Sequence, residues 1–312
     1  MVDYTLGINS YFMATRWPRP EEKFALVREK LDLDCLQYSL DGFETGWPTD
    51  YRNRLVKEIQ NASARYQVNI HSVFTGCGHH DNSFFYHPDK SWREYALAWF
   101  KAAVRFASKI GAKGAGGFTG ALSATEASQP TVRRKRIKEA IDLLTVLSED
   151  AASCGLEFLL IEPMSVVREP PSTVEETLEI VEKINQKAAL PVRLCLDVGH
   201  HRTTSLKGKK ECDPAYWLRQ CGRWVEAIHL HQTDLQASRH WPFTREYNSV
   251  GIVQPEKIIR AIEEAGAVQM TLLIEIFVPA FEPRDNQALE EALASVNFWK
   301  KVLPHKIIRD KP

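Results

Sequence analysis

No stretch of the 312-residue sequence approaches the roughly 18 consecutive apolar residues that a membrane-spanning helix needs. The first residues, Met1–Thr5, have neither the basic region nor the apolar stretch of a signal peptide. We therefore expect a cytoplasmic protein without a membrane partner.

An excess of charge of one sign is also missing, because 40 Lys and Arg balance 40 Asp and Glu. A protein that binds nucleic acid through its phosphates normally carries a basic excess. The one dense basic run, Arg133–Arg136, lies in a helical pattern whose apolar Ile137, Ile141 and Leu144 face the other way. We expect a solvated helix face there and no nucleic-acid partner.

Cysteine is sparse and follows no known pattern. The six cysteines include no Cys-x-x-Cys pair, which favours reduced thiols over a disulfide framework and excludes a zinc ribbon. The Gly-x-Gly-x-x-Gly motif of dinucleotide-binding folds does not follow the first predicted strand. A linker rich in Pro, Ser or Gly is absent as well, so we predict a single domain over residues 1–312.

What the sequence contains is a regular alternation of short apolar stretches with longer amphipathic ones. Several of the short stretches are apolar throughout, as strands buried on both faces are. The predicted strands are Leu6–Asn9, Cys35–Ser39, Val68–Val73, Gly114–Phe118, Glu157–Glu162, Arg193–Val198, Ala227–His231 and Thr271–Ile276. Eight strand–helix repeats in about 300 residues predict an α/β fold, a (β/α)8 TIM barrel, with a doubly wound sheet as the alternative.

Two of the predicted helices carry clear signals. Trp92–Ile110 places small and aromatic apolar residues on one face at helical spacing. A helix after the fifth strand begins at a capping box, either Ser172 with Glu175 or Thr173 with Glu176.

Polar residues stand at the ends of predicted strands, where barrel enzymes place their catalytic groups. Glu162 ends the fifth strand, Asp197 lies near the end of the sixth with His200 three residues on, and Glu275 lies near the end of the eighth. Carboxylates crowded into one site repel and desolvate one another, and a divalent cation removes this conflict. Two Glu, one Asp and one His suit Mn²⁺, Mg²⁺ or Co²⁺ better than a thiolate-preferring ion. We therefore predict one divalent metal site.

The seventh strand carries two histidines, His229 and His231, on the same face. Only the later one reaches the end of the strand. We predict that His231 is the metal ligand and that His229 belongs to a layer of side chains inside the barrel.

The motifs Ile161-Glu162-Pro163, Leu196–His200, His229-Leu230-His231 and Leu273-Ile274-Glu275 together resemble the xylose-isomerase-like TIM-barrel superfamily. The pattern is most similar to its D-tagatose 3-epimerase and sugar-phosphate epimerase branch, over essentially the whole chain. The resemblance implies that Glu162, Asp197, His231 and Glu275 hold the metal. It also implies that Glu162 and Glu275 remove and return a proton on opposite faces of the carbon next to the substrate carbonyl, through an enediolate. His200 would hold a substrate oxygen.

Two positions depart from the pattern of free-ketose epimerases. Arg168 stands six residues after the strand-five glutamate, where those enzymes usually carry a second glutamate. A guanidinium there suits a phosphate or carboxylate group, unless it is a loop arginine paired with Glu169. Ala237 stands where those enzymes carry an arginine, so either Arg239 takes its place or the loop is built differently. We predict an anionic sugar substrate, bound by His200, Arg168 and Arg239.

His71 lies inside the third predicted strand, and two interpretations are open for it. It either reaches the substrate pocket or is a satisfied histidine of the core. We include it among the predicted substrate-binding residues. Trp299, on the last predicted helix, similarly suits either the interface of a homo-oligomer or core packing.

The segments Leu6–Asn9, Arg16–Pro20 and Arg168–Thr173 resemble tetrulose-phosphate epimerases, and also a relative that decarboxylates branched 3-oxo sugar acids of the oxo-isoapionate type. We predict an epimerase or isomerase of a small anionic keto-sugar, such as a tetrulose or pentulose phosphate, with the decarboxylase as the alternative.

Two other classes are disfavoured. Apurinic endonucleases of the superfamily need three metals and further histidines, and the fourth strand here ends in Gly116–Thr119 without one. A non-catalytic binding subunit would not need candidates at all four ligand positions.

Overall fold

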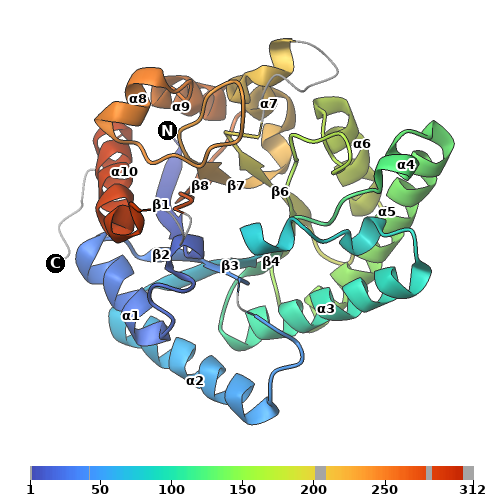
Figure 1. Cartoon of the computed structure of the whole chain (residues 1–312), viewed down its shortest axis with the longest axis horizontal. Helices are drawn as coiled ribbons and strands as arrows, with labels where there is room; N and C mark the ends of the chain where they lie inside the picture. The colour runs from blue at the N-terminus through green and yellow to red at the C-terminus, as the bar shows by residue number, and fades with distance from the viewer. Residues whose placement is uncertain (1, 42, 201–208, 279–282, 305–312) are drawn as a thin grey trace.

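The computed structural model describes residues 2–41, 43–200, 209–278 and 283–304. Eight parallel strands pair in chain order and close into one barrel, with β8 paired to β1 (Figure 1). The strands are β1 (Asp3–Asn9), β2 (Cys35–Ser39), β3 (Asn69–Phe74), β4 (Gly114–Gly117), β5 (Phe158–Ile161), β6 (Val192–Asp197), β7 (Val225–Leu230) and β8 (Gln269–Ile274). Each overlaps a predicted strand. The barrel prediction is confirmed, and closure excludes the doubly wound alternative.

Helices surround the strands on the outside of the barrel (Figure 1). They are α1 (Pro20–Ala25), α2 (Thr49–Tyr66), α3 (Lys90–Lys109), α4 (Ala124–Ala127), α5 (Pro130–Ser153), α6 (Val174–Asn185), α7 (Pro214–Cys221), α8 (Arg245–Val250), α9 (Pro255–Glu264) and α10 (Ala288–Val302). The short α4 and α8 were not predicted, because four and six residues are too few to establish a helical period. None of the described helices is long and apolar enough to cross a membrane.

Local sequence explains why these helices form where they do. Along α3, Ala96, Phe100, Ala103 and Ala107 are buried, as the predicted apolar face requires. Thr173 is the N-cap of α6, and its hydroxyl accepts a hydrogen bond from the backbone N–H of Glu176. The Glu176 carboxylate accepts from the N–H of Ser172, one residue before the position that a capping box requires.

The basic run lies on α5, away from the barrel. Two of its arginines form ion pairs: Arg133 pairs with Glu176 on α6, and Arg136 pairs with Glu126 and Glu139. These ion pairs fit the predicted helix face.

The interior of the barrel contains polar as well as apolar side chains. Asn9, Gln37, Ser72 and His229 are almost completely buried on β1, β2, β3 and β7. Trp299, in contrast, belongs to the core between the barrel and α10: it is fully buried, and its ring centroid lies 5.5 Å from that of Phe243. The interpretation of Trp299 as an interface residue is therefore wrong.

Candidate active site

Three buried carboxylates meet at the carboxyl end of the barrel. Glu162 directly follows β5, Asp197 is the last residue of β6, and Glu275 directly follows β8. Their exposed fractions are 3%, 0% and 6%. One oxygen of each lies within 4.8 Å of the others and of a nitrogen of His229. Position at the strand ends, which the sequence reveals, thus brings the three predicted carboxylates together.

His229, predicted to belong to a layer of side chains inside the barrel, lies directly against these carboxylates. Its Nδ1 is 3.0 Å from an oxygen of Glu275, 3.3 Å from one of Glu162 and 3.8 Å from one of Asp197. Its complete burial fits the predicted layer inside the barrel, but the register that pairs Asp197 with His229 also brings its ring to the carboxylates.

His231, the predicted ligand, contacts the same site from its edge. Its Nε2 lies 2.8 Å from Asp197 Oδ1, and its Nδ1 lies 3.1 Å from the backbone oxygen of Gln232. Its ring stacks on that of His240 at 4.0 Å. Asp197, His231 and His240 therefore form a second group that could hold a metal ion, and Asp197 is shared by both groups.

His200 stands at the border of the site, next to Glu162. It is buried, and its Nδ1 lies 3.2 Å from the backbone oxygen of Pro163 and 3.7 Å from an oxygen of Glu162. Its predicted contact with a substrate oxygen stays a prediction.

The two glutamates have opposite electrostatic environments. Burial raises the pKa of Glu162, although His200 and His229 oppose this shift. Burial also acts to raise the pKa of Glu275, but the imidazoles of His229 and His240 outweigh it and hold that pKa below its usual value. Two carboxylates at one site whose pKa values are pushed apart are suited to act as acid and base.

Asp197 remains ionised despite complete burial. Desolvation acts to raise its pKa, but His200 and His231 hold it well below the usual range. Its Oδ1 also accepts a hydrogen bond of 2.6 Å from the backbone N–H of Gly199.

The donor set fits a divalent cation. Asp197 Oδ2 and His229 Nδ1 are buried and lack a hydrogen-bond partner, and buried polar atoms of this kind are rare unless another group satisfies them. In both histidines the second ring nitrogen is engaged, with Gln37 Oε1 for His229 and with the Gln232 carbonyl for His231. This is how proteins orient histidine ligands of metals. Glu162, Asp197 and Glu275, with His231 or His229, would hold the ion.

Arg168 and Arg239 do not reach the carboxylates in this structure. Arg168 is exposed and donates a 2.5 Å hydrogen bond to the backbone oxygen of Leu122. Arg239 pairs with Asp234 at 3.0 Å and lies over the ring of Trp241. Both lie on loops that follow strands, at the carboxyl end of the barrel, and their role in substrate binding stays a prediction.

His71 lies at the opposite end of the barrel from the carboxylates. It lines a cavity of about 400 Å³ with residues from the amino ends of several strands, among them Asp3, Val225 and Gln269. This position does not fit the predicted substrate-binding role, because His71 stands near the start of β3 and not near its end. It is buried as the core alternative requires, but only its Nδ1 has a partner, Ser72 Oγ at 3.1 Å, and its Nε2 has none among the described residues.

Three residues near the site were missed by sequence reasoning. His240 lies in the loop after β7 and has a φ of +48°, and nothing in the spacing of that loop marks it. Asn9 and Gln37 do have a signal: each is a polar residue in an otherwise largely apolar strand. Asn9 donates hydrogen bonds to Glu275 and Gln37, and Gln37 contacts His229.

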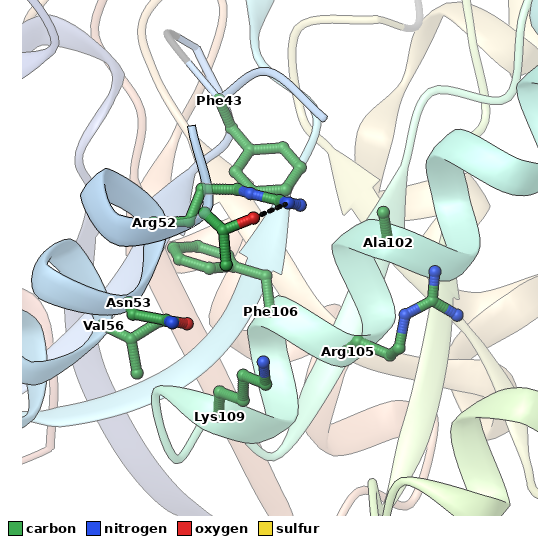
Figure 2. Close-up of a pocket in the computed structure, with 9 residues that line it drawn as sticks. Phe43, Arg52, Asn53, Val56, Ala102, Arg105, Phe106 and Lys109 are labelled. Atoms are coloured by element: carbon green, nitrogen blue, oxygen red, sulfur yellow. Dashed lines mark hydrogen bonds between the residues drawn. The ribbon is translucent and has the colours of Figure 1, made fainter. Parts of the chain in front are cut away.

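The structure also has a groove outside the barrel, between α2 and α3 (Figure 2). It encloses about 150 Å³ over a floor that includes Phe43, Val56 and Phe106. Arg52 contacts the Thr49 hydroxyl at 3.4 Å, and Arg105 and Lys109 lie on the α3 side. The groove lies on the helical layer and is separate from the carboxylate site.

An eight-stranded parallel barrel with carboxylates and histidines at its carboxyl end defines the class of this protein, a TIM barrel with an acidic, histidine-containing site. Residues 30–302 match the family of xylose isomerase-like TIM barrels, and the chain belongs to this family.

Known relatives resemble the chain over nearly its full length. The D-erythrulose 1-phosphate 3-epimerase of Brucella abortus (strain 2308) is 29% identical over 296 residues, which is 95% of each protein. The crystal structure of a protein named as a candidate xylose isomerase from Rhodospirillum rubrum ATCC 11170 is 30% identical, with a TM-score of 0.89 over 96% of this chain and 100% of that one. The D-psicose 3-epimerase of Clostridium cellulolyticum H10 is 15% identical, with a TM-score of 0.70 over 96% of this chain and 100% of that one, and shares the fold.

Proposed function

We propose that this protein is a divalent-metal-dependent epimerase of a small anionic keto-sugar, such as a tetrulose or pentulose phosphate. One observation carries the proposal: Glu162 and Glu275 approach the same atom, His229 Nδ1, from two different strands, at 3.3 and 3.0 Å. Their pKa values are shifted in opposite directions. The similarity to a tetrulose-phosphate 3-epimerase over 95% of the chain supports the substrate class.

The reaction needs one proton acceptor and one proton donor on opposite faces of a carbon next to a carbonyl. Glu275, with the lowered pKa, is suited to remove the proton and leave an enediolate. Glu162, with the raised pKa, is suited to return a proton on the other face and so invert the centre. The roles exchange in the reverse direction. A bound Mn²⁺, Mg²⁺ or Co²⁺ supplies Lewis-acid polarisation of the substrate's carbonyl and hydroxyl oxygens.

Other side chains at the site are placed to bind the substrate or to exclude water. His200, at the edge of Glu162, is placed to donate a hydrogen bond to a substrate oxygen. His80 is half-buried and stacks on Phe118 with ring centroids 4.5 Å apart, where it would help to keep water from the carboxylates. Neither the relatives nor the described contacts give a reason to prefer the decarboxylase alternative.

Proton NMR in D₂O tests the proposal directly. The protein is incubated with Mn²⁺ in every reaction. Each reaction contains one candidate substrate: a tetrulose phosphate, a pentulose phosphate or a 3-oxo sugar acid. We expect a phosphorylated ketose to be converted to its epimer with uptake of one deuterium at the inverted carbon. Glu162→Gln and Glu275→Gln should each lower kcat by at least about a hundredfold, the usual contribution of a positioned acid or base.

Two results would overturn the proposal. If both glutamine variants keep full activity, the two glutamates do not transfer the proton. If CO₂ is released from the oxo acid while none of the ketose phosphates exchanges a proton, the protein is a decarboxylase.

A further inference from the structure

A connected set of buried polar side chains crosses the barrel beside the carboxylates. Asn9 on β1 donates to Glu275 at 2.9 Å and to Gln37 on β2 at 2.7 Å. Gln37 lies 2.7 Å from His229 on β7 and donates to Ser72 on β3 at 3.1 Å. Amides are uncommon inside a barrel that branched aliphatic residues usually fill, and a buried amide is costly unless its partners are present.

The orientation of the Asn9 amide follows from one unambiguous contact. The Asn9 Oδ1 accepts a hydrogen bond of 2.8 Å from the backbone N–H of Tyr11. Because a backbone N–H can only donate, this side of the amide is the oxygen. The Nδ2 group therefore points inward, and its two hydrogens serve Gln37 Oε1 and Glu275 Oε1.

The orientation of Asn9 in turn settles that of Gln37 and of His229. Gln37 must turn its oxygen toward the Asn9 donor, so that the same oxygen faces His229 Nε2. An oxygen without hydrogen can only accept, so His229 carries its proton on Nε2. Nδ1 is then the ring nitrogen left to bind a metal ion. That nitrogen is the one that faces Glu162, Asp197 and Glu275.

We propose that Asn9 and Gln37 are positioning residues, which together hold Glu275 in place and keep the Nε2–H of His229 hydrogen-bonded to Gln37, so that Nδ1 faces the metal. The inference rests on the proposed function, because it concerns the same site. Asn9 acts on Glu275 directly, and Gln37 acts through His229. Aliphatic side chains could fill the same space, but they would not accept the Nε2 proton of His229. The ring could then carry its proton on Nδ1 instead.

The test measures Mn²⁺ binding by calorimetry on the metal-free protein. Gln37→Met removes the acceptor at nearly constant length, and we expect it to raise the Kd for Mn²⁺ by about 10- to 100-fold, as is usual when the partner of a histidine ligand is lost. Gln37→Glu keeps an accepting oxygen in the same place and should restore affinity to within about threefold of the wild type. A merely structural role would not distinguish these two variants in this way.

Asn9→Asp is the second variant in the Mn²⁺-binding experiment. It keeps the oxygen that accepts from Tyr11 and replaces the donating group by an oxygen, so that Gln37 is expected to turn its amide group toward it and toward His229. His229 would then be protonated on Nδ1, and Mn²⁺ affinity should fall as in Gln37→Met. Ser72→Ala is the matched control, since it removes a buried partner of Gln37 that lies away from the carboxylates. We expect its Mn²⁺ affinity to be unchanged.

The outcomes separate this inference from the proposed function. Wild-type protein that binds Mn²⁺ and epimerises, while Gln37→Met and Asn9→Asp bind Mn²⁺ as tightly, refutes the positioning role alone. Wild-type protein without measurable Mn²⁺ affinity refutes both. The melting temperature of each metal-free variant shows that it folds; if Gln37→Met does not, the comparison of Asn9→Asp with Gln37→Glu decides the question.

Discussion

The backbone after β6 lies directly against the ring of His231, because Gly199 has no side chain to keep them apart. A Cβ atom added to Gly199 would lie 1.9 Å from His231 Cε1 and 2.3 Å from its Nε2. Contacts of that length do not occur between real atoms, so any other residue at position 199 must displace the imidazole. The nitrogen concerned is the one that lies 2.8 Å from Asp197.

Gly199→Ala should therefore weaken metal binding at the site with little loss of stability of the barrel. We expect the displaced His231 ring to lower Mn²⁺ affinity by roughly 10- to 100-fold, as the loss of an oriented ligand does. Calorimetry and the melting temperature of the metal-free protein measure the two effects. Gly46→Ala is a fair control, since a Cβ there would meet nothing within 4 Å. Equal Mn²⁺ affinity in Gly199→Ala and wild type would mean that His231 does not bind the metal.

The two histidines of β7 and its end can be compared directly. His229→Gln and His231→Gln each remove one imidazole nitrogen that faces Asp197. We expect both changes to weaken Mn²⁺ binding by at least about tenfold, because both rings have their other nitrogen engaged and present the free one to the carboxylates. Titration of each variant with Mn²⁺ checks this. A variant that retains wild-type affinity identifies the histidine that is not a ligand.

Arg168 offers a test of the anionic substrate. A guanidinium has five donors, and within the described part of the chain Arg168 uses one nitrogen, to bind Leu122 O. We expect Arg168→Gln to raise KM for a phosphorylated ketose by about tenfold or more, because a charge-assisted hydrogen bond is lost. The KM for the same ketose without phosphate should not change. Arg134→Gln, on the exposed face of α5, should leave both values as they are, and an equal rise for both ketoses would argue against phosphate binding by Arg168.

His71 should make the protein sensitive to acid. Burial, with help from Lys113 and His229, lowers its pKa from 6.5 to about 4. As the pH falls through 6.5 the unfolded chain takes up this proton while the folded protein does not, so stability is lost between about pH 6.5 and pH 4. A shift of this size corresponds to roughly 3 kcal/mol.

His71→Gln cannot bind that proton in either state, and its free energy of unfolding should therefore fall less steeply over this pH range. Urea unfolding at a series of pH values measures the slope. His87→Gln, in the loop before α3, serves as the control for replacing a histidine. If His71→Gln and wild type lose stability in parallel, another group is responsible for the acid sensitivity.

The fold and the carboxylate cluster were predictable from sequence for the same reason. Strands buried on both faces are visible as apolar runs, and the closing rule of the barrel then places Glu162, Asp197 and Glu275 at one end. The height of His229 was not predictable, because it depends on the register between β6 and β7. The sequence correctly placed His71 inside the third strand, but it did not show that this side chain lines a cavity at the amino end of the barrel.

Contacts made by loops and by pairs of polar core residues could not be predicted from the sequence either. The stack of His240 on His231 depends on a loop conformation with positive φ, which no pattern in the sequence announces. The partners of Arg239 and Arg168 are an aspartate five residues away and a carbonyl on another loop. Polar residues in apolar strands, such as Asn9 and Gln37, do stand out, but only the closed barrel shows what they contact.

The hydrogen bond from Asn9 to Glu275 joins two residues that are 266 positions apart in the chain. The hydrogen bond cannot form until β8 has paired with β1. The site is therefore complete only after nearly the whole polypeptide has been synthesised. Contacts so distant in sequence form late and slowly in folding. Until that moment the first two carboxylates of the site exist without the third, so neither a nascent chain nor a product truncated before β8 can acquire the activity early.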